Sequence, residues 1–156
     1  MKLADVICQD AIIAQLGSSD RDAVIEELVQ SLGARIKMKA ADVKALAKAV
    51  IKRENEASTG IGKGVAVPHV KHKSVTDPLA VVGCSQEGIG FASLDKQPVY
   101  SVFLLLSPAS DPDKHLQAME TIFKNLQKDD FRRFLRQART SEAIVEAIKD
   151  ADEDIN

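Results

Sequence analysis

The sequence predicts an α/β fold in which a mixed β-sheet of about four to five strands is sandwiched between helices. Two observations support this prediction. Segments with helical periodicity alternate with apolar runs of strand length, and this order favours a sheet between helical layers over separate α and β halves. The 156 residues, 45% of them hydrophobic, suffice for one core but not for two ordinary domains. We therefore expect one domain over residues 1–150 and a frayed acidic tail at 151–156.

Four segments carry apolar residues at helical intervals. Their apolar positions are Val24, Ile25, Leu28, Val29 and Leu32; Val43, Leu46, Ala47, Val50 and Ile51; Phe131, Phe134, Leu135 and Ala138; and Ile144, Val145 and Ile148. The first helix is expected to start after residues 18–20 and to end at Gly33. Thr140 or Ser141 is expected to cap the fourth. A fifth helix is expected to begin near Asp111, which is a good N-cap residue.

Apolar runs of strand length lie between these helices. They are Ala11–Ala14, Val65–Val67, Leu79–Cys84 and Val99–Leu106. Because they are separated by helical segments, a mixed sheet is expected rather than a series of hairpins.

The run STGIGKGVAVPH, residues 58–69, combines alternate glycines with a short apolar strand that ends in Pro68 and His69. Glycines suit a backbone that turns sharply or is approached closely. Pro68 lacks an amide donor, so regular pairing should stop just before the histidine. We expect His69 at a strand end. On these residues alone, a tight loop with a solvated histidine explains the pattern equally well.

Two nucleotide-binding motifs are excluded by spacing. The P-loop needs Ser or Thr after its Lys and Gly five residues before it, whereas Lys63 is followed by Gly64 and preceded at that distance by Ser58. The dinucleotide fingerprint needs a third Gly where Val65 stands. The glycines therefore serve another purpose.

Composition excludes several classes of function. The net charge of -2, from 21 basic and 23 acidic residues along the chain, leaves no sustained basic stripe for binding nucleic acid. Cys8 and Cys84 lack a CxxC spacing and fit reduced thiols better than a disulfide framework. No apolar run approaches the roughly 20 residues of a membrane span, and the N-terminus lacks a secretory cleavage pattern. We expect a cytoplasmic protein without direct membrane insertion.

The pattern RE-x3-STGIG-x-G-x-A-x-PH, residues 53–69, resembles the signature of the type 2 enzyme IIA domains of the bacterial phosphoenolpyruvate-dependent phosphotransferase system. These domains include mannitol, fructose and nitrogen-regulatory branches. The similarity continues downstream through GIGF at 88–91, QPVYSVFLLLSP at 97–108 and HLQAM at 115–119. The resemblance covers most of the chain and implies the same α/β architecture. It implies that His69 accepts a phosphoryl group and that His115 is the second active-site histidine.

Histidine suits a transferable phosphoryl group, because its neutral ring is nucleophilic near neutral pH. Phosphoryl transfer depends largely on placement and electrostatics, so no cofactor or metal is expected. His115 would fall in the first turn of the helix that starts near Asp111, with Pro112 at its first position, close to free backbone amides that attract anions. From spacing alone, His115 is equally compatible with a capping-region residue of no special role.

Four further residues have two readings each. Arg53, near the end of the second helix, either binds phosphate oxygens or is a cation favoured at a helix C-terminus, and the resemblance favours the phosphate role. Ser58 and Thr59 either donate to phosphate or shape the turn. His72 permits a zinc hypothesis with Cys84 and His115, but an H-x2-H pair without a second pair is a weak pattern. His72 fits better in a basic patch with its neighbouring lysines, which is solvated or docks an acidic partner.

The resemblance implies a histidine phosphocarrier of the HPr type as donor, and a IIB domain or a regulated transporter or kinase as acceptor or target. The chain shows no membrane or IIB module, which together with STGIGKG favours the nitrogen-regulatory branch. The first alternative is a stand-alone IIA subunit for uptake of fructose, mannitol or a related sugar. The second, of another class, is a regulatory binding module that is never phosphorylated.

Overall fold

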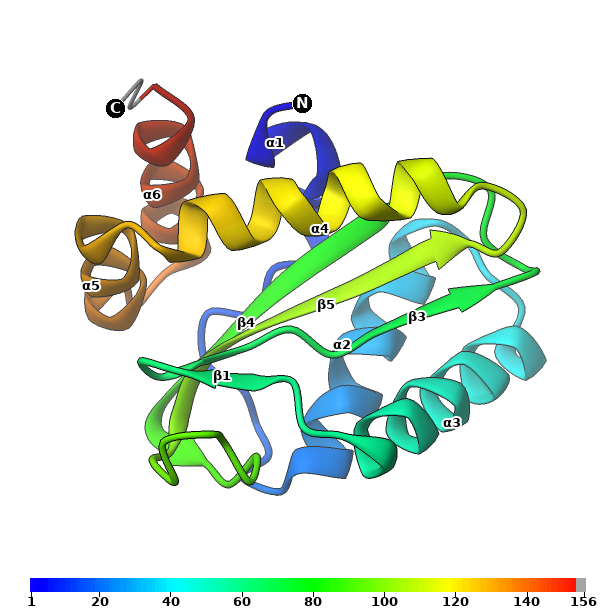
Figure 1. Ribbon diagram of the computed structural model, residues 1–156, viewed down its shortest axis with the longest axis horizontal. Coiled ribbons are helices and arrows are strands. Elements are labelled where there is room, and N and C mark those ends of the chain that lie inside the picture. The colour runs from blue at the N-terminus through cyan, green and yellow to red at the C-terminus, as the bar shows by residue number, and fades with distance from the viewer. Residues whose placement is uncertain (154–156) are drawn as a thin grey trace.

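The computed structural model describes residues 1–153, in which helices and strands alternate along the chain (Figure 1). The helices are α1 (Leu3–Val6), α2 (Arg21–Arg35), α3 (Ala40–Glu56), α4 (Pro112–Leu126), α5 (Asp129–Gln137) and α6 (Ser141–Glu153), with a 3-10 turn at Gln9–Ala11. The strands are β1 (Gly60–Gly62), β2 (Val65–Ala66), β3 (His69–His72), β4 (Leu79–Ile89) and β5 (Val99–Pro108).

All five strands join one mixed sheet that is organised around β5. On one side β5 pairs with β4 in antiparallel orientation. On the other side it pairs in parallel with β2 and then with β3, and β1 pairs antiparallel with β2. The register is the same before and after the break between β2 and β3, because Ala66 lies opposite Val102 and His69 lies opposite Leu105. β2 and β3 are thus two parts of one line of chain, interrupted at Val67 and Pro68.

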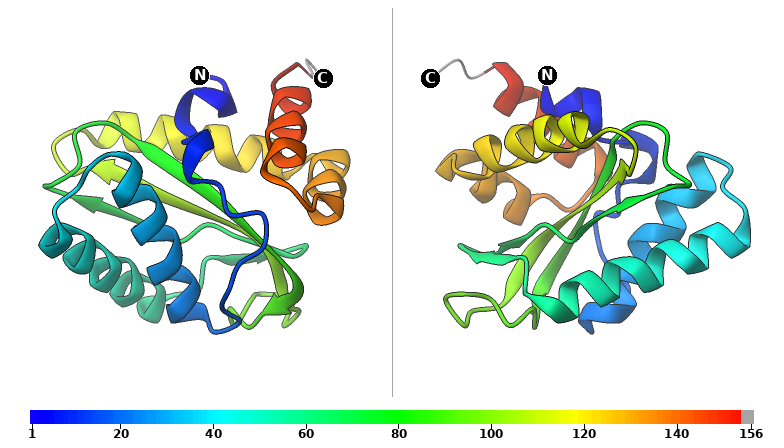
Figure 2. Two further views of the ribbon diagram at one scale, coloured as in Figure 1. Left: turned by 180° about the vertical axis from the view of Figure 1, so that it is seen from behind. Right: turned by 45° about the vertical axis from the view of Figure 1, so that its right-hand side comes forward.

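Helices cover both faces of this sheet. Figures 1 and 2 show α2 and α3 on one face, and α1, α4, α5 and α6 on the other. Side chains along β5 alternate between the two cores: Val102 and Leu104 pack with α2 and α3, whereas Phe103 and Leu105 pack with α4, α5 and α6. The predicted fold class, a mixed sheet between helical layers, is confirmed.

The caps of two helices agree with the sequence predictions. Asp111 Oδ1 accepts a hydrogen bond from the backbone amide of Lys114 at 3.2 Å, at the start of α4. Of the two candidates for the start of α6, Thr140 is the cap, because its Oγ1 accepts from the amide of Ala143 at 3.1 Å. The first turn of each helix is therefore held by a side chain that precedes it.

The predicted end of the first periodic helix was wrong, because this helix, α2, continues through Gly33 to Arg35. Gly33 is buried, and a Cβ atom there would lie 2.6 Å from Cγ2 of Val43 in α3. The glycine permits close approach of two helices. The chain turns at Lys37 instead, which has a φ of 56°.

Two further expectations differ from the structure. Ala11–Ala14 is not a strand: the 3-10 turn ends at Ala11, and Ile13 forms only an isolated bridge to Gly83 of β4. The expected frayed tail is helical as far as Glu153, since Asp152 accepts hydrogen bonds from the amides of Leu3 and Ala4 at 2.6 and 2.9 Å. Residues 154–156 of that tail lie outside the described residues.

Candidate functional site

His69 is the first residue of β3, directly after the interruption at Val67 and Pro68. Pairing is irregular just before the histidine, as Pro68 predicts, but it resumes at His69 opposite Leu105. The amide of Leu105 also donates to the carbonyl of Pro68 at 3.0 Å. The expected strand end is therefore the start of a new strand, and the histidine backbone is held by the central strand β5.

A contact with its own backbone fixes the ring of His69. Nδ1 lies 2.8 Å from the carbonyl oxygen of Val67. A carbonyl oxygen only accepts hydrogen bonds, so Nδ1 carries the hydrogen and the neutral ring keeps its lone pair on Nε2. The nitrogen available for nucleophilic attack is thus Nε2.

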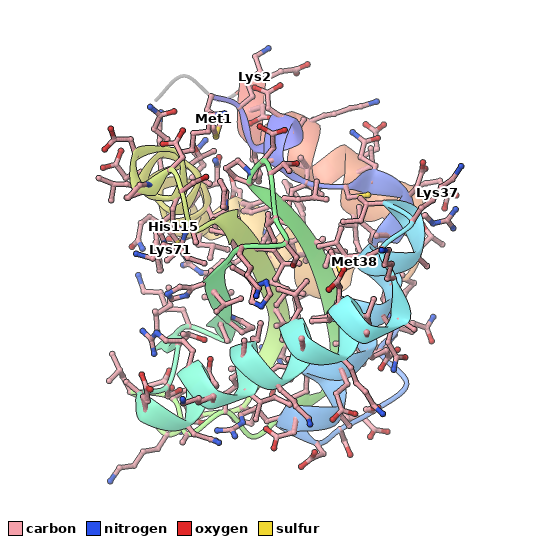
Figure 3. The ribbon with its side chains drawn as sticks, turned by 90° about the vertical axis from the view of Figure 1, so that its right-hand side faces the viewer. Met1, Lys2, Lys37, Met38, Lys71 and His115 are labelled. Atoms are coloured by element: carbon pink, nitrogen blue, oxygen red, sulfur yellow. The ribbon has the colours of Figure 1, made fainter. Side chains whose placement is uncertain are left out.

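His115 of α4 lies beside His69, as the family resemblance implied. The two ring centroids are 5.6 Å apart and the ring planes are inclined by 40°. Nδ1 of His115 lies 2.7 Å from Oγ of Ser107, a fully buried residue near the end of β5. Figure 3 shows that His115 and Lys71 of β3 lie close together in that view, and the charge of Lys71 acts on the His115 ring. The site thus joins the start of β3, the end of β5 and the start of α4.

Burial favours the neutral form of both rings. It is the main cause that lowers the pKa of His69, with a smaller lowering by the positive charge of Arg53. The Val67 carbonyl and the Glu54 carboxylate act in the opposite direction, but the net shift is downward. Burial also lowers the pKa of His115, helped by His69 and Lys71. Both imidazoles are therefore mostly neutral, and nucleophilic, near pH 7.

Glu54 is a buried carboxylate beside the site that the sequence analysis did not assign. It is 2% exposed, and it accepts hydrogen bonds from the amide of Thr59 at 2.6 Å and from the Thr59 hydroxyl at 2.7 Å. The signal was present in the periodicity, because Glu54 falls four residues after Val50 and eight after Leu46 on the buried stripe of α3. A carboxylate on an apolar stripe needs a partner.

The hydroxyl groups of Ser58 and Thr59 are both engaged within the loop. Ser58 Oγ donates to the carbonyl of Phe91 at 2.5 Å and accepts from the amide of Gly60 at 3.0 Å. Thr59 donates its only hydroxyl hydrogen to Glu54. In this structure both side chains shape the turn, which was the alternative to direct donation to phosphate.

The contacts of Arg53 are compatible with both of its predicted roles, a cation at a helix C-terminus and a phosphate-binding residue. Its Nη1 donates to the carbonyl of Ala57 at 3.1 Å, which satisfies an acceptor at the C-terminal end of α3. Its charge also acts on His69 and lowers the pKa of that ring. A guanidinium at this place can stabilise negative charge on a group attached to His69.

His72 is not part of the site. Its Nδ1 accepts a hydrogen bond from the amide of Ser74 at 3.1 Å and lies 2.8 Å from the Ser74 hydroxyl. Cys84 is buried in β4, which raises the pKa of its thiol to about 11. Within residues 1–153, no group of three His, Cys, Asp or Glu side chains is arranged to hold a metal ion. No helix in the same part of the chain has the length and apolar character needed to cross a membrane.

Two relatives of known class are similar along nearly the whole chain. The fructose-specific EIIABC component of Bacillus subtilis is 32% identical over 97% of this chain, which spans 24% of that longer protein. A nitrogen regulatory protein of Klebsiella oxytoca is 31% identical over 97% of this chain and 92% of its own length.

Solved structures share the fold. The nitrogen regulatory protein IIA-Ntr of Neisseria meningitidis superposes with a TM-score of 0.82 at 24% identity, over 94% of this chain and 98% of the other. Enzyme IIA of the Escherichia coli mannitol system, in its complex with phosphorylated enzyme IIB, gives a TM-score of 0.75 at 16% identity, over 93% and 99% of the chains. Residues 5–151 match the family described as phosphoenolpyruvate-dependent sugar phosphotransferase system, EIIA 2, and the chain belongs to that family.

Proposed function

We propose that this chain carries phosphoryl groups between proteins and that His69 is the phospho-accepting residue. The observation that carries the proposal is the hydrogen bond from His69 Nδ1 to Val67 O, which leaves Nε2 as the nucleophile of a neutral, oriented ring. Membership of the EIIA 2 family supports the same reaction. A binding module that is never phosphorylated has no need of this arrangement.

In the proposed step, the lone pair of His69 Nε2 attacks the phosphorus atom of a phosphohistidine on a phosphocarrier of the HPr type. A new N–P bond forms, the bond between phosphorus and the donor ring breaks, and the donor ring keeps that electron pair. Nδ1 keeps its hydrogen, which stays hydrogen-bonded to the carbonyl oxygen of Val67 during the step. That carbonyl stabilises the positive charge that the phosphorylated ring acquires.

The proposed role of His115 is to hold the phosphoryl oxygens. If the Ser107 hydroxyl donates to Nδ1 of His115, the ring hydrogen lies on Nε2, which then donates to the phosphoryl group. Arg53 adds positive charge near His69. Ser58 and Thr59 are proposed to contribute through the shape of their turn, which carries the chain into β1.

The proposed acceptor is a IIB domain or a regulated transporter or kinase. The Escherichia coli mannitol IIA protein was solved together with its phosphorylated IIB partner, which supports a surface of this fold that docks a second protein. Leu116, 57% exposed and next to His115, supplies apolar contact area beside the reacting rings.

Within the family we favour the nitrogen-regulatory branch, because the Klebsiella oxytoca regulator aligns with this chain over 92% of its own length. Uptake of fructose, mannitol or a related sugar is the second candidate, and the 32% identity to the Bacillus subtilis fructose component supports it. The two are separated by mixing the phosphorylated chain with a fructose-specific or a mannitol-specific IIB domain. Transfer within seconds to either domain would assign the chain to uptake, and stable phosphorylation would favour regulation.

The phosphocarrier proposal is tested by intact-mass analysis after incubation with phosphoenolpyruvate and the upstream phosphotransferase proteins. Wild type should gain one acid-labile phosphoryl group, and His69→Ala should gain none. His72→Ala is the matched control, because it removes a histidine from the same strand whose ring is held by Ser74. Equal labelling of wild type and His69→Ala would refute the assignment, and no labelling of wild type would favour the unphosphorylated binding module.

A further inference from the structure

A basic pocket lies under α5, apart from the two histidines. Its cavity has a volume of about 630 Å³, and five cationic side chains line it: Lys63, Arg132, Arg133, Arg136 and Arg139. We call these five residues the α5 basic pocket. Of the residues that the structure describes, Asp129 is the only acidic one in the lining of this cavity, in a chain whose net charge is -2. An adjoining cavity of about 430 Å³ shares Lys63, Arg132 and Arg136.

Three of the guanidinium groups are held in place. The Arg136 guanidinium carbon lies 3.6 Å from the centroid of the Tyr100 ring. Arg139 Nη1 donates to the carbonyls of Arg136 and Gln137 at 3.1 and 3.0 Å, at the C-terminal end of α5. Arg132 Nη1 donates to the carbonyl of Leu126 at 2.6 Å. These groups are therefore already oriented before a ligand arrives, which reduces the entropic cost of binding.

Part of this positive charge has no counterion among the described residues 1–153. Arg132 pairs with Asp129, and Arg133 pairs with Asp130. Within residues 1–153, no carboxylate pairs with Arg136 or Arg139. The stacking of Arg136 on Tyr100 involves the face of its guanidinium and not its N–H edge. Such an edge is suited to bidentate recognition of phosphate oxygens.

The loop before β2 is shaped to complete the pocket. Gly64 has a φ of 78°, and a Cβ atom there would lie 3.1 Å from Cδ2 of Tyr100. The amide of Tyr100 donates to the carbonyl of Gly64 at 2.8 Å. The glycine lets the ring pack against the loop that carries Lys63, so the aromatic platform under Arg136 is built from residues distant in sequence.

The α5 basic pocket is separate from the histidine site. Ser101 of β5 lines the adjoining cavity, whereas Leu105 lies opposite His69, and four strand residues correspond to about 13 Å. Figure 1 shows α5 at the end of α4 opposite to its start, where His115 lies. A phosphoryl group on His69 therefore cannot reach the α5 basic pocket.

We propose that the α5 basic pocket binds a small phosphorylated molecule, whose phosphate groups lie between Arg136, Arg139 and Lys63. The cavity volume falls in the range of about 300–1,000 Å³ that is usual for small-molecule sites. The concave shape and the fixed guanidinium groups favour a compact ligand with several phosphate oxygens over an extended acidic segment of another protein. The proposal is independent of phosphorylation at His69.

The test is a titration of the unphosphorylated wild-type chain with inorganic pyrophosphate, followed by ¹⁵N NMR and calorimetry at constant ionic strength. We expect saturable shifts of the amides of Lys63, Tyr100 and Arg136. Arg136→Gln should weaken binding by at least about tenfold, the effect of losing one charge-assisted hydrogen bond. Arg136→Lys should recover only part of the loss, because it restores the charge without the planar fork.

The matched control is Arg35→Gln, which removes the same charge from the exposed end of α2. It should leave the affinity for pyrophosphate unchanged. Equal weakening by Arg35→Gln and Arg136→Gln would overturn the proposal, because overall charge would then account for binding. Shifts confined to His69 and Arg53 would also overturn it. Tighter binding of an acidic peptide, such as hexa-aspartate, than of pyrophosphate would assign the surface to a protein partner instead.

Discussion

Nδ1 of His69 lies 2.8 Å from the carbonyl oxygen of Val67, two residues earlier in the same chain. The ring is thus oriented by a local contact across Pro68, whose ring fixes the backbone between the two groups. Neither a distant side chain nor a partner protein is needed to select the nucleophilic nitrogen. In the proposed reaction, the nucleophile is therefore already oriented in the free protein, and a docking partner needs only to bring phosphorus into line.

Removal of the Ser107 hydroxyl should slow phosphoryl transfer without preventing folding. In Ser107→Ala, the hydrogen bond to His115 Nδ1 is lost, so the ring is free to adopt the tautomer that offers no donor to phosphate. Rapid-quench measurements should show a rate of phosphoryl transfer lower by about tenfold for Ser107→Ala. For His115→Ala, the expected loss is larger, about a hundredfold. Ser101→Ala, a buried serine on the same strand, is the matched control. Unchanged rates of phosphoryl gain and loss in both Ser107→Ala and His115→Ala would remove these two residues from the mechanism.

Acidification should destabilise the protein through His69. Its pKa is lowered in the folded state, so below about pH 6.5 the unfolded chain binds a proton that the folded chain does not. The free energy of unfolding is therefore highest above pH 6.5 and falls as the pH drops towards the folded-state pKa. In His69→Asn this loss should be smaller. Urea unfolding between pH 5 and 8 measures both curves, and parallel curves for the two proteins would contradict the assignment.

Loss of the Glu54 carboxylate should destabilise the loop before β1. In Glu54→Gln, one of the two acceptors for Thr59 becomes a donor, and a buried polar group is left without its partner. The expected cost in unfolding free energy is about 1–3 kcal/mol. The control is Glu56→Gln, an exposed position in the same helix turn, which should change stability little. Equal effects of the two substitutions in urea unfolding would show that Glu54 acts only through its charge.

A methyl group at Gly33 should force α2 and α3 apart. The Cβ atom of Gly33→Ala would meet Cγ2 of Val43 at 2.6 Å, and overpacking of this kind costs about 1–3 kcal/mol. The companion variant Val43→Ala removes the clashing methyl groups. The double variant should therefore be more stable than the sum of the two single effects predicts, as a double-mutant cycle measures. Strict additivity would mean that the contact does not limit helix approach.

The layered architecture could be predicted from the sequence, because periodicity is a local signal, whereas the association of His115 with His69 was implied by the resemblance of a long motif to a known family. Helix caps at Asp111 and Thr140 were predictable for the same reason. Contacts that depend on distant segments were missed. The buried position of Ser107 under His115 is visible only once β5 and α4 are stacked.

Errors at single residues have the same origin. Glycine is a residue type typical of helix ends, which is why Gly33 was predicted to end the helix. In the structure, a glycine is needed at this position because Val43 of the next helix lies too close for a Cβ atom. Ile13 lies in an apolar run of strand length, yet the neighbouring edge of β4 gives it only one bridge. The α5 basic pocket depends on Tyr100 and Arg136, which are far apart in sequence and stack only in the folded chain.

The break at Pro68 also decides how other proteins can approach. Within residues 1–153, β3 pairs only with β5, so its outer side is an open edge of the sheet. Such an edge usually invites an extra strand from another chain. Next to that edge, the carbonyl of Val67 is already occupied by the ring of His69. A strand added across this point would compete with the His69 ring for the Val67 carbonyl. Under the proposed function, we therefore expect partners that exchange phosphate to recognise the histidines with side chains or helix ends rather than by strand addition.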